Sequence, residues 1–148
     1  MINSARQLSL QIHSMAVPHT CLILPFLYMG VIFLFSSIQG DGSPAIVDPL
    51  THAIKSIIYN GAHIPLFALL AWLWCWSLAG WNIALNRRLM LAFCLTAIYG
   101  VSDEWHQSFT PGRDASFLDV MLDMLGAYLA VHFYRGQQRT SADGRTIL

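Results

Sequence analysis

An all-α integral membrane protein with four transmembrane helices is the fold that this sequence predicts, and three observations lead to it. Apolar residues make up 55% of the chain and charged residues only 11%, against about 25% charged residues in soluble domains. Two stretches, 7–40 and 56–86, contain no Asp, Glu, Lys or Arg, and each exceeds the roughly 20 residues that cross a bilayer core. Turn-forming residues separate the apolar segments. The net charge of zero argues against a nucleic-acid partner, whose phosphates require a basic surface.

The chain is expected to form a single membrane domain over residues 1–148, in which four apolar segments are the transmembrane helices. These spans cover residues 19–37, 60–80, 89–106 and 116–134. Turn chemistry predicts connections at 39–44, 82–88 and 111–114. Isoleucines at helical spacing predict a short interfacial helix over 48–60, ahead of the second span. The polar residues 135–148 are expected to form a flexible tail.

The basic residues predict the orientation of these spans in the membrane. Four spans place both termini on the same side, and the segments on that side contain six arginines: Arg6, Arg87, Arg88, Arg135, Arg139 and Arg145. The opposite side contains only Lys55 and Arg113. Because cytoplasmic segments are enriched in Lys and Arg, we expect both termini and the tail to be cytoplasmic. The turn at 111–114 then faces outward.

Acidic residues gather around this outward turn. Five of the eight acidic residues fall between positions 103 and 123: Asp103, Glu104, Asp114, Asp119 and Asp123. On a helix, Asp103, Glu104 and Gln107 lie on one broad stripe, whereas Asp119 and Asp123 share a face of the next helix. Asp123 lies seven residues after Ser116, a depth of about 10 Å that a short side chain cannot bridge to the surface. Charges placed so deeply are costly unless they are paired or functional.

The short turn makes the last two helices antiparallel neighbours, so their polar side chains are expected to meet at a similar depth. A histidine of the second span, near the same end, joins them from the side. The predicted site consists of His63, Asp103, Glu104, His106, Gln107, Arg113, Asp119 and Asp123.

Three interpretations of this cluster remain open from the residues alone. In the first, Arg113 pairs with carboxylates, the remaining acids are protonated or hydrogen-bonded, and the network only holds helices together. In the second, carboxylates and a histidine bind a divalent cation such as Mg, Ca, Mn or Zn as a cofactor. Glu104 and Asp119 are then the acid/base or metal pair of a membrane enzyme, with His106 as a further catalytic group, acting on a lipid-linked phosphate or glycan.

In the third interpretation the same pocket binds or moves a ligand without covalent chemistry, as buried acids and histidines do in substrate sites and proton relays. Arg113 is then the anion anchor, since its guanidinium can bind a phosphate bidentately. The other ligand-binding residues are Asp103, Gln107, Asp123 and His63. The expected ligand is a polar envelope lipid, a glycan or an antibiotic-like molecule.

The last two predicted spans and the turn between them contain the run Tyr99-Gly-Val-Ser-Asp-Glu-Trp-His-Gln107, followed by Pro111-Gly-Arg-Asp114, Ser116, Asp119-Val120 and Gly126-Ala127. In these residues the chain resembles the VanZ-like membrane protein family. Ser36-Ser37 and His63 also resemble positions that this family marks. Two positions depart from the pattern: Asp123 stands where the family usually has Asn, and Ala130 where Gly is common. The resemblance implies a small protein of the bacterial inner membrane with a role at the cell envelope, where founding members are linked to teicoplanin resistance. The expected partners of the protein are the lipid bilayer, an envelope lipid or glycan as ligand, and an envelope enzyme.

Overall fold

The computed structural model describes residues 19–38, 49–113 and 116–142. The loop predicted at 39–44 and the end of the predicted tail therefore lie outside the described residues, as does Asp114. Side chains of residues 49–60 also lie outside the description, although their backbone is helical.

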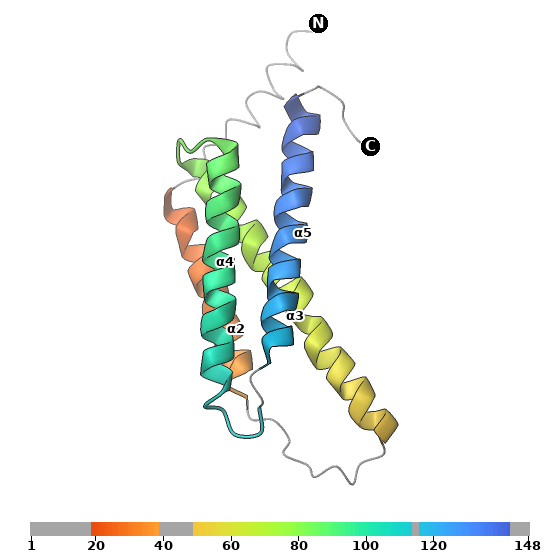
Figure 1. Ribbon diagram of the computed structural model, residues 1–148. Coiled ribbons are helices and arrows are strands. Elements are labelled where there is room, and N and C mark those ends of the chain that lie inside the picture. The colour runs from red at the N-terminus through yellow and green to blue at the C-terminus, as the bar shows by residue number, and fades with distance from the viewer. Residues whose placement is uncertain (1–18, 39–48, 114–115, 143–148) are drawn as a thin grey trace, which may run out of the picture.

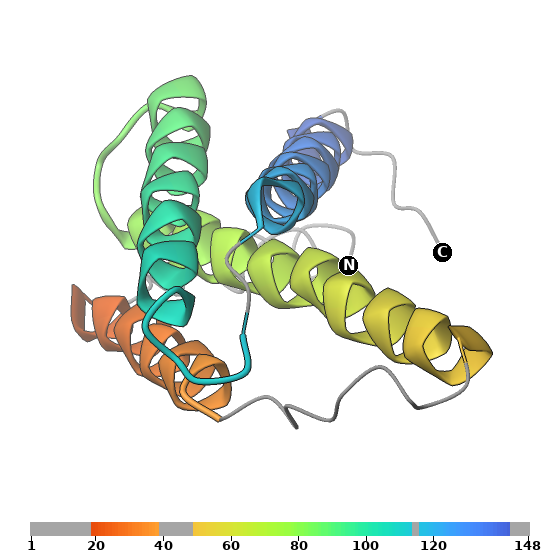
Figure 2. The same cartoon turned by 60° about the horizontal axis from the view of Figure 1, so that its bottom comes forward.

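The described part of the chain forms four α-helices and no strand, which confirms the all-α prediction. In chain order these are the 3-10 turn η1 (His19–Leu22), α2 (Ile23–Ser36), α3 (Pro49–Ser77), the 3-10 turn η2 (Leu78–Gly80), α4 (Leu85–Gln107) and α5 (Phe117–Ala142). Consecutive helices run in opposite directions (Figure 1). Helix α3 contacts the other three helices and packs most extensively against α5, which it crosses obliquely (Figure 2). Helix α4 packs next most extensively against α5, and α2 contacts α3 and α4 less extensively.

Three helices extend beyond their predicted boundaries, whereas the predicted start of the first span and end of the second are 3-10 turns. Helix α3 is continuous from Pro49, so the expected interfacial helix and the second span form one element. Pro49 stands at the first helical position, where its missing N–H and fixed φ are favourable. Helix α4 begins at Leu85 rather than near 89. Helix α5 continues to Ala142 where a flexible tail was expected, and the hydrogen bond from Arg135 Nη2 to Asn86 Oδ1, 2.7 Å, ties this extension to α4.

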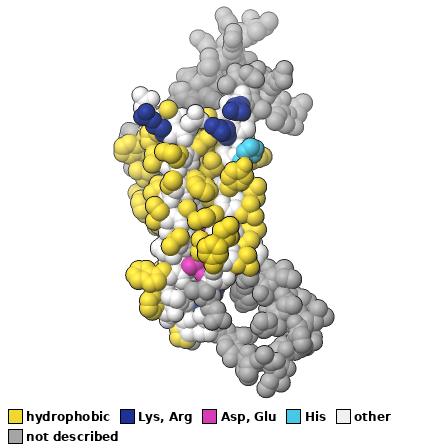
Figure 3. All heavy atoms as spheres, in the orientation of Figure 1, with side chains coloured by type: hydrophobic (Ala, Val, Ile, Leu, Met, Phe, Trp, Pro, Cys, Tyr) yellow, Lys and Arg dark blue, Asp and Glu magenta, His cyan; other side chains and the backbone are white. Residues whose placement is uncertain are grey.

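The bundle has an apolar surface and a polar interior at one of its ends. Large hydrophobic side chains cover its flanks (Figure 3), and on α2 Phe26, Leu27 and Leu34 are each more than half exposed. By contrast, Asp103 and Asp123 are buried. Among the described residues, two segments are long and apolar enough to cross a membrane, Gly61–Gly80 and Phe117–Arg139, and Ile23–Ser36 is a shorter apolar helix. Such a distribution is favourable in lipid, because lipid tails solvate the apolar surface that water would not.

The two ends of the bundle differ in charge. Arg87 and Arg88 open α4, and Arg135 and Arg139 lie near the end of α5, so the antiparallel arrangement brings these four side chains to one end, which we call the arginine end. Figure 3 shows basic side chains at this end of the molecule, beyond the apolar belt. The core nearest this end is apolar and aromatic, with Arg88 lying 5.4 Å from the centre of the Tyr134 ring.

Candidate functional site

At the end opposite the arginine end, all four helices contribute side chains to a buried group that we call the polar centre. It consists of Ser36 from α2, His63 from α3, Asp103, Glu104 and Gln107 from α4, and Asp119 and Asp123 from α5. Each is at most 7% exposed except His63, whose side chain is 12% exposed. Six of the eight residues that the sequence predicted for the site are therefore brought together.

The turn between α4 and α5 sets the register of the polar centre. Gly112 has a φ of 75°, a left-handed conformation that a glycine adopts without strain. Ser116 then caps α5, because its Oγ accepts a hydrogen bond from the N–H of Leu118 at 3.2 Å. The N–H of Ser116 itself donates to Glu104 Oε2 at 2.8 Å. The start of α5 is thus held directly against the carboxylate of α4.

Asp103 joins α2 to α4. Its Oδ2 accepts hydrogen bonds from Ser36 Oγ at 2.9 Å and from Gln107 Nε2 at 2.8 Å. Gln107 is one helical turn beyond Asp103 on α4, so this second bond follows from helix geometry. Asp103 is thereby fixed by one donor from its own helix and one from a neighbour.

His63 and Asp123 form a second contact, between α3 and α5. The distance between His63 Nδ1 and Asp123 Oδ1 is 2.8 Å, and the imidazole lies nearly parallel to the ring of Phe67, 6.1 Å between centres. Gly100 of α4 makes room for this pair, because a Cβ there would lie 2.9 Å from Asp123 Oδ2. Asp123, at 1% exposure, is the most deeply buried acid of the polar centre.

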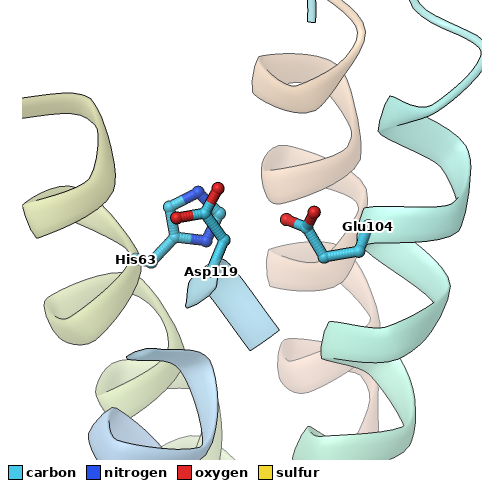
Figure 4. A group of neighbouring side chains, drawn as sticks. All are labelled: His63, Glu104 and Asp119. Atoms are coloured by element: carbon cyan, nitrogen blue, oxygen red, sulfur yellow. The ribbon is translucent and has the colours of Figure 1, made fainter. Parts of the chain in front are cut away.

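His63, Glu104 and Asp119 form a third group, within the polar centre. One potential ligand atom each from His63, Glu104 and Asp119 lies within 4.8 Å of the other two. Figure 4 shows these side chains, from α3, α4 and α5, directed toward a common space. Within the described part of the chain, four buried carboxylate oxygens accept no hydrogen bond: Asp103 Oδ1, Glu104 Oε1, Asp119 Oδ1 and Asp123 Oδ2. A buried acceptor without a donor costs about 1–3 kcal/mol, and more when it is charged. The concentration of four such oxygens makes this the candidate site.

An open pocket of about 350 Å³ lies beside the polar centre, between α2 and α4. It is lined by Phe33, Tyr99, Ser102, Asp103, Trp105, His106 and Phe109. His106 belongs to this pocket wall rather than to the polar centre, with its ring 4.4 Å from that of Phe33 and its Nε2 3.0 Å from Ser37 Oγ. Asp103 lines the pocket and also belongs to the polar centre, so it connects the two.

A model of the VanZ/LLP1 family matches residues 20–138. The chain belongs to the VanZ/LLP1 family. No curated protein and no solved structure was found to match it. The segment matched to VanZ/LLP1 contains the whole polar centre and the pocket beside it, and together with the two membrane-length apolar helices it identifies a VanZ-like membrane protein.

Arg113 lies at the edge of this VanZ-like site, at the carboxyl end of α2. Its Nη2 donates to the carbonyl of Phe35 at 3.2 Å and its Nε to the carbonyl of Ile38 at 3.4 Å. These contacts hold Arg113 against the last turn of α2 and the residue Ile38 beyond it, beside the polar centre.

Several residues of this VanZ/LLP1 chain that line the site were absent from the predicted set. Ser36 donates to Asp103, and Phe33, Trp105 and Phe109 line the pocket. For Trp105 and Phe109 a local signal exists: both are large aromatic residues that follow the acidic pair Asp103-Glu104 within five residues, Trp105 in the last turn of α4 and Phe109 in the turn after it. Phe33 carries no such signal, and Ser36 is marked only by its resemblance to a family position, because both residues approach the site through the packing of α2 on α4.

Proposed function

We propose that this VanZ-like protein spans the bacterial inner membrane four times and binds a glycan-bearing envelope molecule, a glycolipid or a glycopeptide, at the outer end of the bundle. The observation that carries this proposal is the pocket between α2 and α4. It combines aromatic rings with Ser102, Asp103 and His106 and adjoins the buried carboxylates of the polar centre.

The orientation follows from the charges at the two ends. The arginine end is the cytoplasmic end, because positively charged residues concentrate on the cytoplasmic side. Both termini then lie in the cytoplasm, and the polar centre and the pocket open toward the outer leaflet. Exposed aromatic residues beside the pocket, among them Trp105 and Phe109, suit the headgroup level of that leaflet.

The chemistry of the pocket favours hydroxyl or amino groups as its ligand. Carboxylate oxygens only accept hydrogen bonds, and Asp103 has one buried oxygen, Oδ1, that accepts none in the described structure. Sugars supply many hydroxyl donors, and aromatic side chains supply the apolar walls that small-molecule sites generally have. A phosphate placed against Asp103 would instead meet a like charge.

Lipid analysis of the detergent-purified protein tests this proposal. We expect a glycan-bearing lipid to co-purify and to fall about tenfold, equivalent to about 1.4 kcal/mol, in the Trp105→Ala variant, which loses a pocket wall. Trp76→Ala is the matched control, since Trp76 is also exposed but lies on α3 near the arginine end. Mass spectrometry of the bound lipids measures the effect.

Addition of a soluble glycopeptide to the delipidated protein distinguishes the two sources of the glycan. If the glycopeptide quenches the tryptophan fluorescence of the wild-type protein but not that of the Trp105→Phe variant, the glycopeptide is favoured as the ligand. Identical bound lipids in the wild type and in Trp105→Ala, together with no fluorescence response, would refute glycan binding at the pocket.

A further inference from the structure

The group formed by His63, Glu104 and Asp119 has properties of its own, separate from the pocket between α2 and α4. Two buried carboxylates and an imidazole from three helices approach within 4.8 Å (Figure 4). We propose that these three side chains bind a divalent transition-metal ion, zinc in particular, in the interior of the bundle. Binding at this place does not depend on the glycan ligand proposed above.

The carboxylates supply the first argument. Glu104 and Asp119 are 5% and 7% exposed, and Glu104 Oε1 and Asp119 Oδ1 are buried without a hydrogen-bond donor in the described structure. Neighbouring buried anions are costly unless an opposite charge compensates them. A divalent cation neutralises two carboxylates at once and occupies the lone pairs that no donor fills.

Asp123 supplies the second argument, because its position beside His63 matches what metal-binding histidines require. Such histidines almost always donate their second ring N–H to a carboxylate or carbonyl, which fixes the tautomer and the ring orientation. Asp123 Oδ1 lies 2.8 Å from His63 Nδ1 and is therefore placed to accept that N–H. The tautomer so selected leaves Nε2 of His63 with its lone pair for a metal ion. Asp123 is thus a positioning residue.

The donor set selects the kind of ion. One imidazole nitrogen and two carboxylate oxygens suit zinc, whereas calcium and magnesium prefer oxygen ligands alone. Ligand atoms around zinc lie about 2.0–2.2 Å from the ion, so binding draws the three side chains slightly together. Three protein ligands leave a fourth position free for water or another ligand, as in zinc sites that are not purely structural.

The metal content of the full-length protein, purified in detergent, tests the inference. We expect elemental mass spectrometry to find about one zinc ion per chain in the wild-type protein. In the Glu104→Gln and Asp119→Asn variants we expect the zinc content to fall to about a tenth or less, which corresponds to a loss of at least an order of magnitude in affinity. Asp103→Asn is the matched control, because Asp103 is an equally buried acid of α4 that lies outside the three-residue group. Gel filtration and helix content by circular dichroism establish that each variant is folded.

A second measurement needs no variant. The wild-type protein is stripped with a chelator and titrated with zinc chloride or, separately, magnesium chloride while its melting temperature is recorded. Zinc is expected to raise the melting temperature, because a metal that binds only the folded chain stabilises it, and magnesium to leave it unchanged. Folded wild-type protein that neither contains nor takes up zinc would overturn the inference, as would Asp119→Asn protein that holds as much zinc as the wild type.

Discussion

Among the individual residues, the acids of the polar centre differ in how many hydrogen bonds their carboxylate oxygens accept. Asp103 accepts two hydrogen bonds on Oδ2, and Glu104 accepts one from the backbone of Ser116, yet each keeps a second oxygen that is buried and without a donor. Hydrogen bonds formed within the protein position these side chains but leave acceptors available. This combination of fixed geometry and unfilled acceptors is what a preorganised binding site requires.

Gly126 is the residue on which the crossing of α3 and α5 depends. A Cβ at this position would run into the backbone carbonyl of Ile64 and would lie 3.1 Å from the backbone nitrogen of Ala68. Since backbone atoms cannot move aside as a side chain can, we expect Gly126→Ala to destabilise the fold by about 1–3 kcal/mol. Thermal unfolding in detergent measures this change.

Gly30→Ala is the control for Gly126→Ala, because a Cβ on Gly30 meets nothing within 4 Å. Alanine forms helices better than glycine by about 1 kcal/mol, so this variant is expected to melt at or above the temperature of the wild type. Equal melting temperatures for Gly126→Ala and the wild type would show that α3 and α5 do not approach as closely as the structure has them.

At the scale of elements, the sequence predicts the helices well because charge-free stretches and turn residues alternate along the chain. Their ends are less predictable. Asn60 and Gly61 suggest a break, but glycine in a helix costs only about 1 kcal/mol, and α3 runs through them. The polar residues after Tyr134 suggest a tail, but α5 continues to Ala142 and Arg135 bonds to α4. In both cases the chain continues a helix that is already formed and packed.

The acidic cluster could be predicted from the sequence because carboxylates inside apolar helices stand out and a short turn makes α4 and α5 neighbours. The hydrogen-bond partners within the cluster could not be predicted in this way. Ser36 and Asp103 are 67 residues apart, and His63 and Asp123 are 60 residues apart. No local pattern relates such positions. Their contacts follow from how α2 and α3 pack against the last two helices.

At the scale of the whole molecule, the bundle is polar at both ends for different reasons. The arginine end carries cations at the helix ends, beside an apolar core. The opposite end carries buried acids and an open pocket. Between them the surface is an apolar belt (Figure 3). This asymmetry is the physical basis of the proposed orientation, in which the arginine end faces the cytoplasm.

Reporter fusions in a bacterial host test this orientation. Alkaline phosphatase, which is active only outside the cytoplasm, is expected to be active when fused after Pro111, in the connection between α4 and α5, and inactive when fused after Leu148. A fluorescent protein that matures only in the cytoplasm should give the reverse pattern at the same positions. Phosphatase activity at the carboxyl terminus would contradict the four-span arrangement with cytoplasmic termini.

We propose that the buried carboxylates of the polar centre form a ligand site and do not merely hold the helices together. The most direct test is the melting temperature of Glu104→Gln protein beside the wild type, both in chelator, so that bound metal contributes to neither. Glutamine keeps an oxygen for the N–H of Ser116 and removes the buried charge. If the carboxylate serves a ligand, the variant is expected to have an unchanged or higher melting temperature. A fall equivalent to about 3–5 kcal/mol, the usual cost of breaking a buried structural ion pair, would contradict it.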